Sequence, residues 1–200
     1  GDGKATKDNK FYVVESDEFN RHFTAYHPAY SIITNIECEH MEIYKDIDDI
    51  VNTFQEFANK TKNTIIACGD NEYIRQINFE KDVLYYGFDE SNDVYAKNVV
   101  LTEEGSSFDV YMNGEFYGHF VLPLFGKHMI LNCLAAIIVC KLQNVEYSVM
   151  DDLLKTFKNA KRRFALEVVN GQIIVDDYAH HPTEIRVTLE AVRQKYPNKE

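Results

Sequence analysis

Short apolar runs alternate with a helical pattern through the first half of this chain, and that alternation restricts the folds it can adopt. Residues 11–14, 30–36, 64–68 and 83–88 have the length and the β-branched or aromatic content of buried strands. Residues 46–60 carry apolar side chains at the spacing of one helical face. Strands separated by helices favour parallel βαβ units, so we expect an α/β fold with a mostly parallel sheet flanked by helices.

A different pattern begins after residue 89. Asn113-Gly114 separates two alternating runs, residues 107–112 and 115–120, and residues 94–100 form a further strand-like run. Asn-Gly between such runs is the strongest short-range hairpin signal, because both turn positions need a positive φ. We therefore expect an antiparallel hairpin module appended to the parallel sheet.

Two helices are expected next, at residues 129–142 and 148–157. The first is apolar on nearly every face, which predicts a buried helix, and Asn132 is its exception. A buried amide without a hydrogen bond costs roughly 1–3 kcal/mol. Asn132 has two interpretations: a structural bond to nearby backbone, or an amide that points at a polar ligand.

Residues 176–184 concentrate two Asp, a Tyr and two His, which packing alone does not explain. They follow the apolar run 172–175 and precede the amphipathic run 184–196, so we expect a strand, a polar loop and a helix. Pro182 suits the first helical position, with a polar cap before it. In open α/β sheets, ligands bind outside the carboxyl ends of strands, where this cluster falls.

Composition excludes several classes of protein. With 21 Lys and Arg against 32 Asp and Glu, the formal charge is −11, which argues against a non-specific nucleic-acid binder. No apolar run reaches the ~18 residues that cross a membrane, and no signal peptide is visible. Four cysteines without C-x-x-C spacing favour reduced thiols in the cytoplasm. The start at Gly1 without Met and the charged end at residues 197–200 lead us to expect a piece of a longer chain.

Three apolar runs are followed by carboxylates, amides or imidazoles, at residues 15–18, 35–40 and 176–181. Glu15 with His40 makes an Mg²⁺ site conceivable, because Mg²⁺ takes one or two protein ligands and completes its shell with water and phosphate oxygens. His40 taken alone is more often an ordinary loop histidine.

Other chemistries lack support. A zinc site would need nearby Cys or paired helical His, and a Ser-His-Asp enzyme would need a nucleophile elbow. Neither residues 1–5 nor residues 125–128 match the G-x-x-x-x-G-K-[ST] pattern of a P-loop.

Five motifs carry a family resemblance, and the last of them is the most specific. They are Glu15-Ser16-Asp17-Glu18, Thr34-Asn35-Ile36-Glu37-Cys38-Glu39-His40, Gly126-Lys127-His128-Met129-Ile130-Leu131-Asn132, Arg162-Arg163-Phe164 and Asp177-Tyr178-Ala179-His180-His181-Pro182-Thr183-Glu184. Their order resembles that of the Mur ligases, and the similarity runs through nearly all 200 residues.

The resemblance implies two domains and a reaction. Residues 1–161 would be the central ATP-binding domain without its P-loop, and residues 162–200 the first strand–helix unit of a C-terminal Rossmann-like domain. The domain that holds the UDP-sugar would be absent, so the chain by itself is expected to be inactive. The family forms amide bonds with ATP: a carboxylate is phosphorylated to an acyl phosphate, which an amine then attacks.

Within the family, the chain most resembles the branch that adds L-alanine to UDP-N-acetylmuramate. The branch that recycles the murein tripeptide shares the His-His-Pro-Thr signature, whereas Tyr178 and Glu184 favour the alanine branch. A non-catalytic nucleotide-binding scaffold domain of the same fold is the alternative from another class. A P-loop upstream of Gly1 would favour the enzyme.

The resemblance also implies residue roles in the central domain. Glu15 and His40 would bind Mg²⁺, and Asn132 would contact the adenine of ATP. Many family members have an Asn at the position of Met129, whose thioether cannot donate an amide hydrogen bond, so only Asn132 is carried over.

The later motifs imply four further roles. Arg163 would reach the nucleotide phosphates, and Asp177 would meet the nucleotide when the domains close. With His40, these two residues form the implied catalytic set. Tyr178 and His180 would face the amino-acid substrate.

Overall fold

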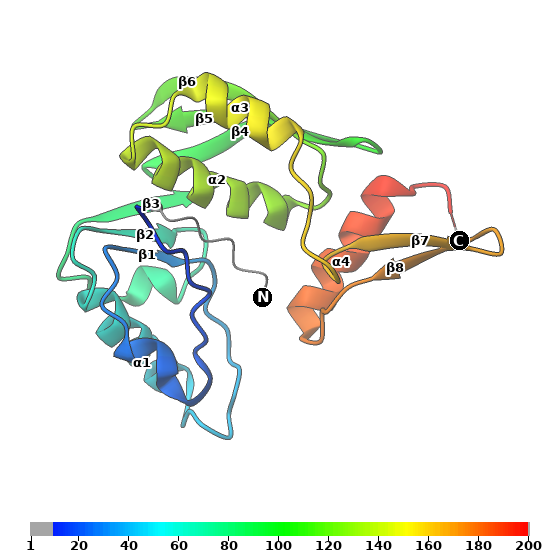
Figure 1. The fold of residues 1–200 in the computed structure, drawn as a ribbon. Coiled ribbons are helices and arrows are strands. Elements are labelled where there is room, and N and C mark those ends of the chain that lie inside the picture. The colour runs from blue at the N-terminus through cyan, green and yellow to red at the C-terminus, as the bar shows by residue number, and fades with distance from the viewer. Residues whose placement is uncertain (1–9, 200) are drawn as a thin grey trace.

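The computed structural model describes residues 10–199, and its main sheet has six strands in the order β1-β2-β3-β4-β5-β6 (Figure 1). Strands β1 to β4 pair in parallel, and β4, β5 and β6 pair antiparallel. The predicted α/β class, with an antiparallel module appended to a parallel sheet, is confirmed. The six strands are β1 (Tyr30–Ile33), β2 (Thr64–Cys68), β3 (Val83–Gly87), β4 (Val94–Thr102), β5 (Gly105–Met112) and β6 (Glu115–Leu122). Residues 1–5, which do not match a P-loop, lie outside the described residues.

Helix α1 (Ile47–Asn59) begins where the sequence predicts it. The side chain of Asp46 accepts a hydrogen bond from the backbone N–H of Asp49 at 2.9 Å, which caps the first turn. Ile50, Val51 and Ala58 on the apolar face of α1 are buried in the core. Two short 3₁₀ segments, η1 (Phe19–Ala25) and η2 (Ile74–Gln76), lie in the connections.

The Asn-Gly hairpin is confirmed. Asn113 and Gly114 both have positive φ, at 51° and 82°, as the tight turn between β5 and β6 requires. Phe108, Val110 and Phe120 on the inner face of this module are fully buried. The module therefore shares one core with the parallel part of the sheet.

The apolar run at residues 11–14 does not form the predicted buried strand. Phe11, Tyr12, Val13 and Val14 are 53%, 84%, 95% and 58% exposed and belong to no strand. Strand β1 pairs with β2, and no other strand of residues 10–199 pairs with β1. A strand-like run becomes a strand only where a neighbouring strand supplies hydrogen-bond partners, which periodicity does not reveal.

Helix α2 (Lys127–Leu142) is less buried than predicted. Ile130, Leu134 and Ile137 are buried, but Asn132 and Ala136, four residues apart, are exposed on another face. The helix packs against β2, β3 and β4 on one side only, which leaves a stripe open to water. Water can therefore satisfy the amide of Asn132, so no structural hydrogen bond is needed there.

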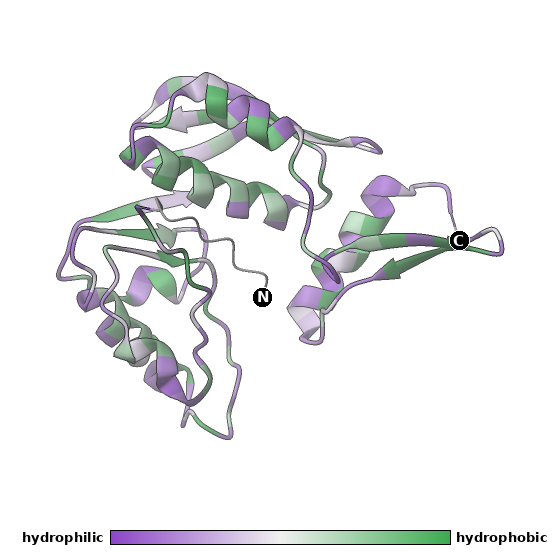
Figure 2. Ribbon diagram, in the orientation of Figure 1, coloured by the Kyte–Doolittle hydropathy of each residue, from purple (hydrophilic) through white to green (hydrophobic). Residues whose placement is uncertain are grey.

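A second, two-stranded sheet follows helix α3 (Tyr147–Lys155). Strands β7 (Ala165–Val169) and β8 (Gln172–Asp176) are antiparallel, and Figure 2 shows both as largely hydrophobic. The sequence predicted β8 but not β7. The missed signal was Asn170-Gly171, a second Asn-Gly turn with φ values of 51° and 81°.

Helix α4 (Pro182–Lys195) completes the chain, with Pro182 at its first position and His181 as the cap residue, as predicted. None of the helices within residues 10–199 is long and apolar enough to cross a membrane.

Cys38, Cys68, Cys133 and Cys140 are free, and burial raises the pKa of Cys133 to about 12. Such a thiol stays protonated and unreactive near neutral pH.

Candidate active site

The loop after β1 is held by an asparagine network. The Nδ2 of Asn71 donates to Asn35 Oδ1 at 2.8 Å and to the Ile36 carbonyl at 3.0 Å. Its Oδ1 accepts the backbone N–H groups of Tyr73 and Ile74, both at 3.0 Å, which holds the turn that leads into η2. One side chain thus ties together the connections that follow β1 and β2, and so positions the loop that carries Glu39 and His40.

His40 contacts carboxylates from two segments. Its Nε2 lies 3.1 Å from Glu18 Oε1, and its Nδ1 lies 3.5 Å from Glu42 Oε1. Glu18, Glu39 and His40 each offer a ligand atom, and these atoms lie within 4.8 Å of one another. The sequence paired His40 with Glu15, but the structure leaves Glu15 exposed and outside this group. Glu18, three residues later, occupies that place.

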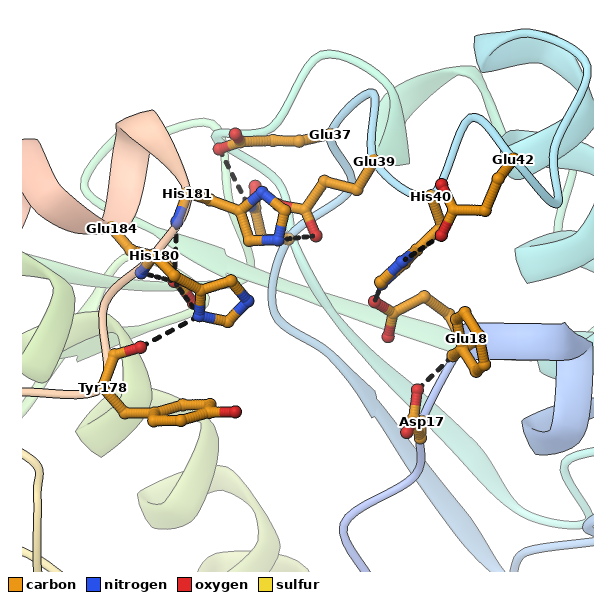
Figure 3. Close-up of polar contacts among 12 residues, drawn as sticks. Asp17, Glu18, Glu37, Glu39, His40, Glu42, Tyr178, His180, His181 and Glu184 are labelled. Atoms are coloured by element: carbon orange, nitrogen blue, oxygen red, sulfur yellow. Dashed lines mark hydrogen bonds and ion pairs between the residues drawn. The ribbon is translucent and has the colours of Figure 1, made fainter.

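Glu39 links this group to the segment that follows β8. Its Oε2 lies 3.5 Å from Nε2 of His181 (Figure 3). Burial raises the pKa of Glu39, the nearby His181 opposes the rise, and the carboxylates of Glu18 and Glu37 add to it. A partly buried carboxylate among other carboxylates, as Glu39 is, forms an environment that a bound cation would stabilise.

Asp177 shapes the turn that follows β8. Its Oδ2 accepts the backbone N–H of Phe164 at 2.7 Å, and its Oδ1 accepts that of Ala179 at 2.9 Å. The backbone N–H of Tyr178 donates to the Arg162 carbonyl at 3.0 Å. Each oxygen of Asp177 keeps a further lone pair, so the carboxylate can hold the turn and still accept a bond from a ligand.

The two histidines before α4 are ordered by Glu184. Glu184 Oε2 accepts the backbone N–H groups of His180 and His181, at 3.0 and 3.3 Å. Burial of the Glu184 carboxylate is outweighed by these donors and by the two imidazoles, so its pKa is lowered. Nδ1 of His180 lies 2.9 Å from the carbonyl of Tyr178, which orients that ring.

The structure brings together part of the predicted site. His40 and His181 lie with their ring centroids 6.2 Å apart, with Glu18 and Glu39 beside them (Figure 3). His180 stands next to His181, with ring centroids 4.5 Å apart, and Tyr178 stands next to His180, with centroids 5.1 Å apart. We use the name acidic–histidine cluster for Glu18, Glu39, His40 and His181.

Two predicted residues lie on open surface. Asn132 is exposed on α2, and Arg163 is exposed between α3 and β7. Sequence reasoning missed Glu18, Glu39 and His181 as individual contributors. All three lie in polar runs that it had marked, but the choice among neighbouring residues depends on backbone geometry that periodicity does not give.

Comparison with known proteins decides the family. Residues 3–140 match the model of the Mur ligase middle domain, well over half of the chain. The chain belongs to the Mur ligase family.

Solved Mur ligases share its fold. The UDP-N-acetylmuramate-alanine ligase MurC from Thermotoga maritima superposes with a TM-score of 0.76 at 23% identity, over 90% of this chain and 41% of that one. MurF from the same organism, in complex with ADP, gives 0.68 at 21% identity, over 84% and 39%. A murein peptide ligase from Psychrobacter arcticus gives 0.64 at 25% identity, over 89% and 37%. The chain therefore spans about two fifths of the length of these ligases.

Proposed function

We propose that this chain contributes the central part of an ATP-dependent ligase that joins L-alanine to the carboxylate of UDP-N-acetylmuramate. The match of residues 3–140 to the Mur ligase middle domain supports the ligase part of the proposal, and Tyr178 and Glu184 favour L-alanine as the amine. In this proposal, residues 1–161 form the nucleotide-binding domain, and residues 162–200 begin a C-terminal domain that supplies Asp177, Tyr178 and His180.

The acidic–histidine cluster fits a divalent cation. Three of its members, Glu18 from one segment and the neighbours Glu39 and His40 from another, bring their ligand atoms within 4.8 Å of one another. Carboxylate oxygens are the ligands that Mg²⁺ prefers. We propose that Glu18, Glu39 and His40 hold Mg²⁺. The ion would supply electrostatic stabilisation of phosphoryl and acyl-phosphate charge.

The other residues would bind and orient substrates. The exposed amide of Asn132 suits recognition of the adenine ring of ATP. The exposed guanidinium of Arg163 suits contact with the nucleotide phosphates, because its planar fork presents several donors. Asp177 would hold the turn that presents Tyr178 and His180 toward the amine substrate.

A titration with Mn²⁺, a spectroscopic substitute for Mg²⁺, tests the cation site directly on the 200-residue chain. Glu18→Gln and Glu39→Gln should each weaken binding about tenfold or more, because each removes an anionic ligand. Glu72→Gln is the matched control, since Glu72 is exposed and outside the cluster. The alternative pair, Glu15 with His40, predicts instead that Glu15→Gln weakens binding and Glu18→Gln does not.

The reaction itself is tested in a full-length ligase that carries this chain. Phosphate release should depend on ATP, UDP-N-acetylmuramate and L-alanine together. Arg163→Ala should lower turnover by orders of magnitude while the fold is kept, because the exposed side chain contributes little packing. Turnover near that of the wild type would remove Arg163 from the mechanism.

A second candidate reaction is recycling of the murein tripeptide. It is kept because murein peptide ligases are among the similar structures, at 24% and 25% identity. The same assay with the tripeptide in place of L-alanine separates the two reactions by their values of kcat/KM.

A further inference from the structure

Helix α4 is attached to the main-sheet unit at both of its ends. At its start, His181 meets Glu39 of the acidic–histidine cluster. At its end, Gln194 and Lys195 contact the β4–β5 turn and the segment before α2. The helix has 14 residues, so these attachments are separated by roughly 20 Å at 1.5 Å per residue. Figure 1 shows α4 in this bridging position, between the second sheet and α2.

The carboxamide of Gln194 is bonded through both of its polar atoms. Its Nε2 donates to the carbonyls of Thr102 and Gly105, at 3.1 and 2.8 Å, and lies 3.3 Å from Ser106 Oγ. Its Oε1 accepts the backbone N–H of Gly126 at 2.7 Å. A primary amide has two donors and an acceptor, so it matches this set of partners, whereas a carboxylate does not.

The packing around Gln194 is close. Ala191, one turn earlier on α4, is fully buried. Gly126 has a φ of +89°, and a Cβ there would lie 2.6 Å from the ring of His128 and 3.2 Å from the Cβ of Ala191. The ammonium of Lys195 lies 4.3 Å from the ring centroid of Phe125, and cation–π contacts of this kind add to the docking. A side chain at Gly126 would therefore crowd both His128 and α4, so the close docking of α4 favours glycine at this position.

The attachment at the start of α4 cannot orient the helix alone. His181 and Glu39 meet through one contact of 3.5 Å, and their side chains are 27% and 25% exposed. A single partly exposed ion pair contributes little to stability, and one contact does not fix the orientation of α4 relative to the main sheet. The several directional bonds of Gln194 fix both the rotation and the position of α4.

We propose that Gln194 is a positioning residue, whose carboxamide docks α4 on the β4–β5 turn and on Gly126 and thereby holds His181 against Glu39. The role deepens the proposed ligase site and rests on it, since it explains how residues from the two parts of the chain reach one cluster. Gln194 itself touches no substrate in this proposal.

The experiment uses the 200-residue chain without nucleotide or metal and compares Gln194→Leu and Gln194→Glu with wild type. Hydrogen exchange of the Gly126 amide reports the docking, and the NMR cross-peak between the His40 and His181 rings reports the cluster. The ring contact between Tyr117 and Tyr147, at 6.0 Å, is an internal control for the core. Arg186→Ala is the matched variant, because Arg186 lies on the same helix and its side chain is 64% exposed. Its guanidinium pairs with Glu190 of the same helix, at 3.5 Å.

In Gln194→Leu, the Gly126 amide should exchange at least about tenfold faster, because its acceptor is lost. The His40–His181 cross-peak should disappear while the Tyr117–Tyr147 contact remains. Gln194→Glu should also lose the cross-peak, because a carboxylate faces the carbonyls of Thr102 and Gly105 without a proton to donate.

Arg186→Ala should match wild type in both measurements. A His40–His181 cross-peak that persists in Gln194→Glu, or that is absent from wild type, would overturn the proposal. Should Gln194→Leu fail to fold, Gln194→Glu decides. Because no ligand is present, these outcomes are independent of the Mn²⁺ titration, so failure of the cation site and failure of the docking role remain distinguishable.

Discussion

Replacing Asn71 with alanine should loosen the loop that carries Glu39 and His40. The substitution removes two bonds from Nδ2, to Asn35 Oδ1 and to the Ile36 carbonyl. It also removes two bonds accepted by Oδ1 at the start of η2. Loss of such a side-chain acceptor for turn N–H groups, by analogy with a helix cap, costs about 1 kcal/mol. Each remaining bond contributes about 0.5–1.5 kcal/mol net.

Together these losses predict a fall of about 2–3 kcal/mol in the free energy of unfolding, after allowance for the partial exposure of Asn71. For a chain of this length, that corresponds to a fall in Tm of roughly 4–12 °C. Urea unfolding followed by circular dichroism measures the free energy, and a thermal scan measures Tm.

Two further variants separate the parts of the network. Asn71→Asp keeps an acceptor for the Tyr73 and Ile74 amides but has no donor, so its loss should be about half that of alanine. Asn78→Ala makes the same chemical change at an exposed position and should stay within about 0.5 kcal/mol of wild type. An Asn71→Ala variant as stable as Asn78→Ala would refute the inferred role of the network.

Three shorter predictions concern α2 and the antiparallel module. Burial lowers the pKa of His128, so the unfolded chain binds this proton more readily and wild-type stability should fall as the pH drops below about 6.5. In urea titrations at several pH values, His128→Asn should show a weaker fall. Gly118→Ala should cost about 1–3 kcal/mol in the same assay, because the new Cβ would lie 2.3 Å from the ring of Tyr147. Asn132→Leu should weaken ATP binding in a calorimetric titration of a full-length ligase yet leave its Tm similar or higher; a large loss of Tm would contradict the exposed position.

Local signals accounted for much of the fold. The strands β2 and β3, the helix α1 with its Asp46 cap and the Asn113-Gly114 turn follow from rules that act over a few residues. The second Asn-Gly turn, at Asn170-Gly171, obeyed the same rule and could have predicted β7. Such features are determined locally because caps and tight turns are stabilised by neighbours in sequence.

The candidate site depended on more than local rules. The resemblance placed His40 in a metal site and Tyr178 and His180 near a substrate, and these roles stay predictions. The sequence reasoning paired His40 with Glu15, whereas in the structure Glu18, three residues later, is the glutamate that meets His40. That choice rests on how the segment before η1 turns toward the loop after β1, and no short pattern encodes it.

By itself, the sequence predicted the α/β class, most of the elements in their order and the polar residues at the strand ends. Only the tertiary structure decided that residues 11–14 are exposed, that α2 leaves Asn132 open to water and that Gln194 docks on Gly126. The physical reason is the distance along the chain. Gly126 and Gln194 lie 68 positions apart. Such a contact forms only where the packing of the elements between the two residues brings complementary groups together.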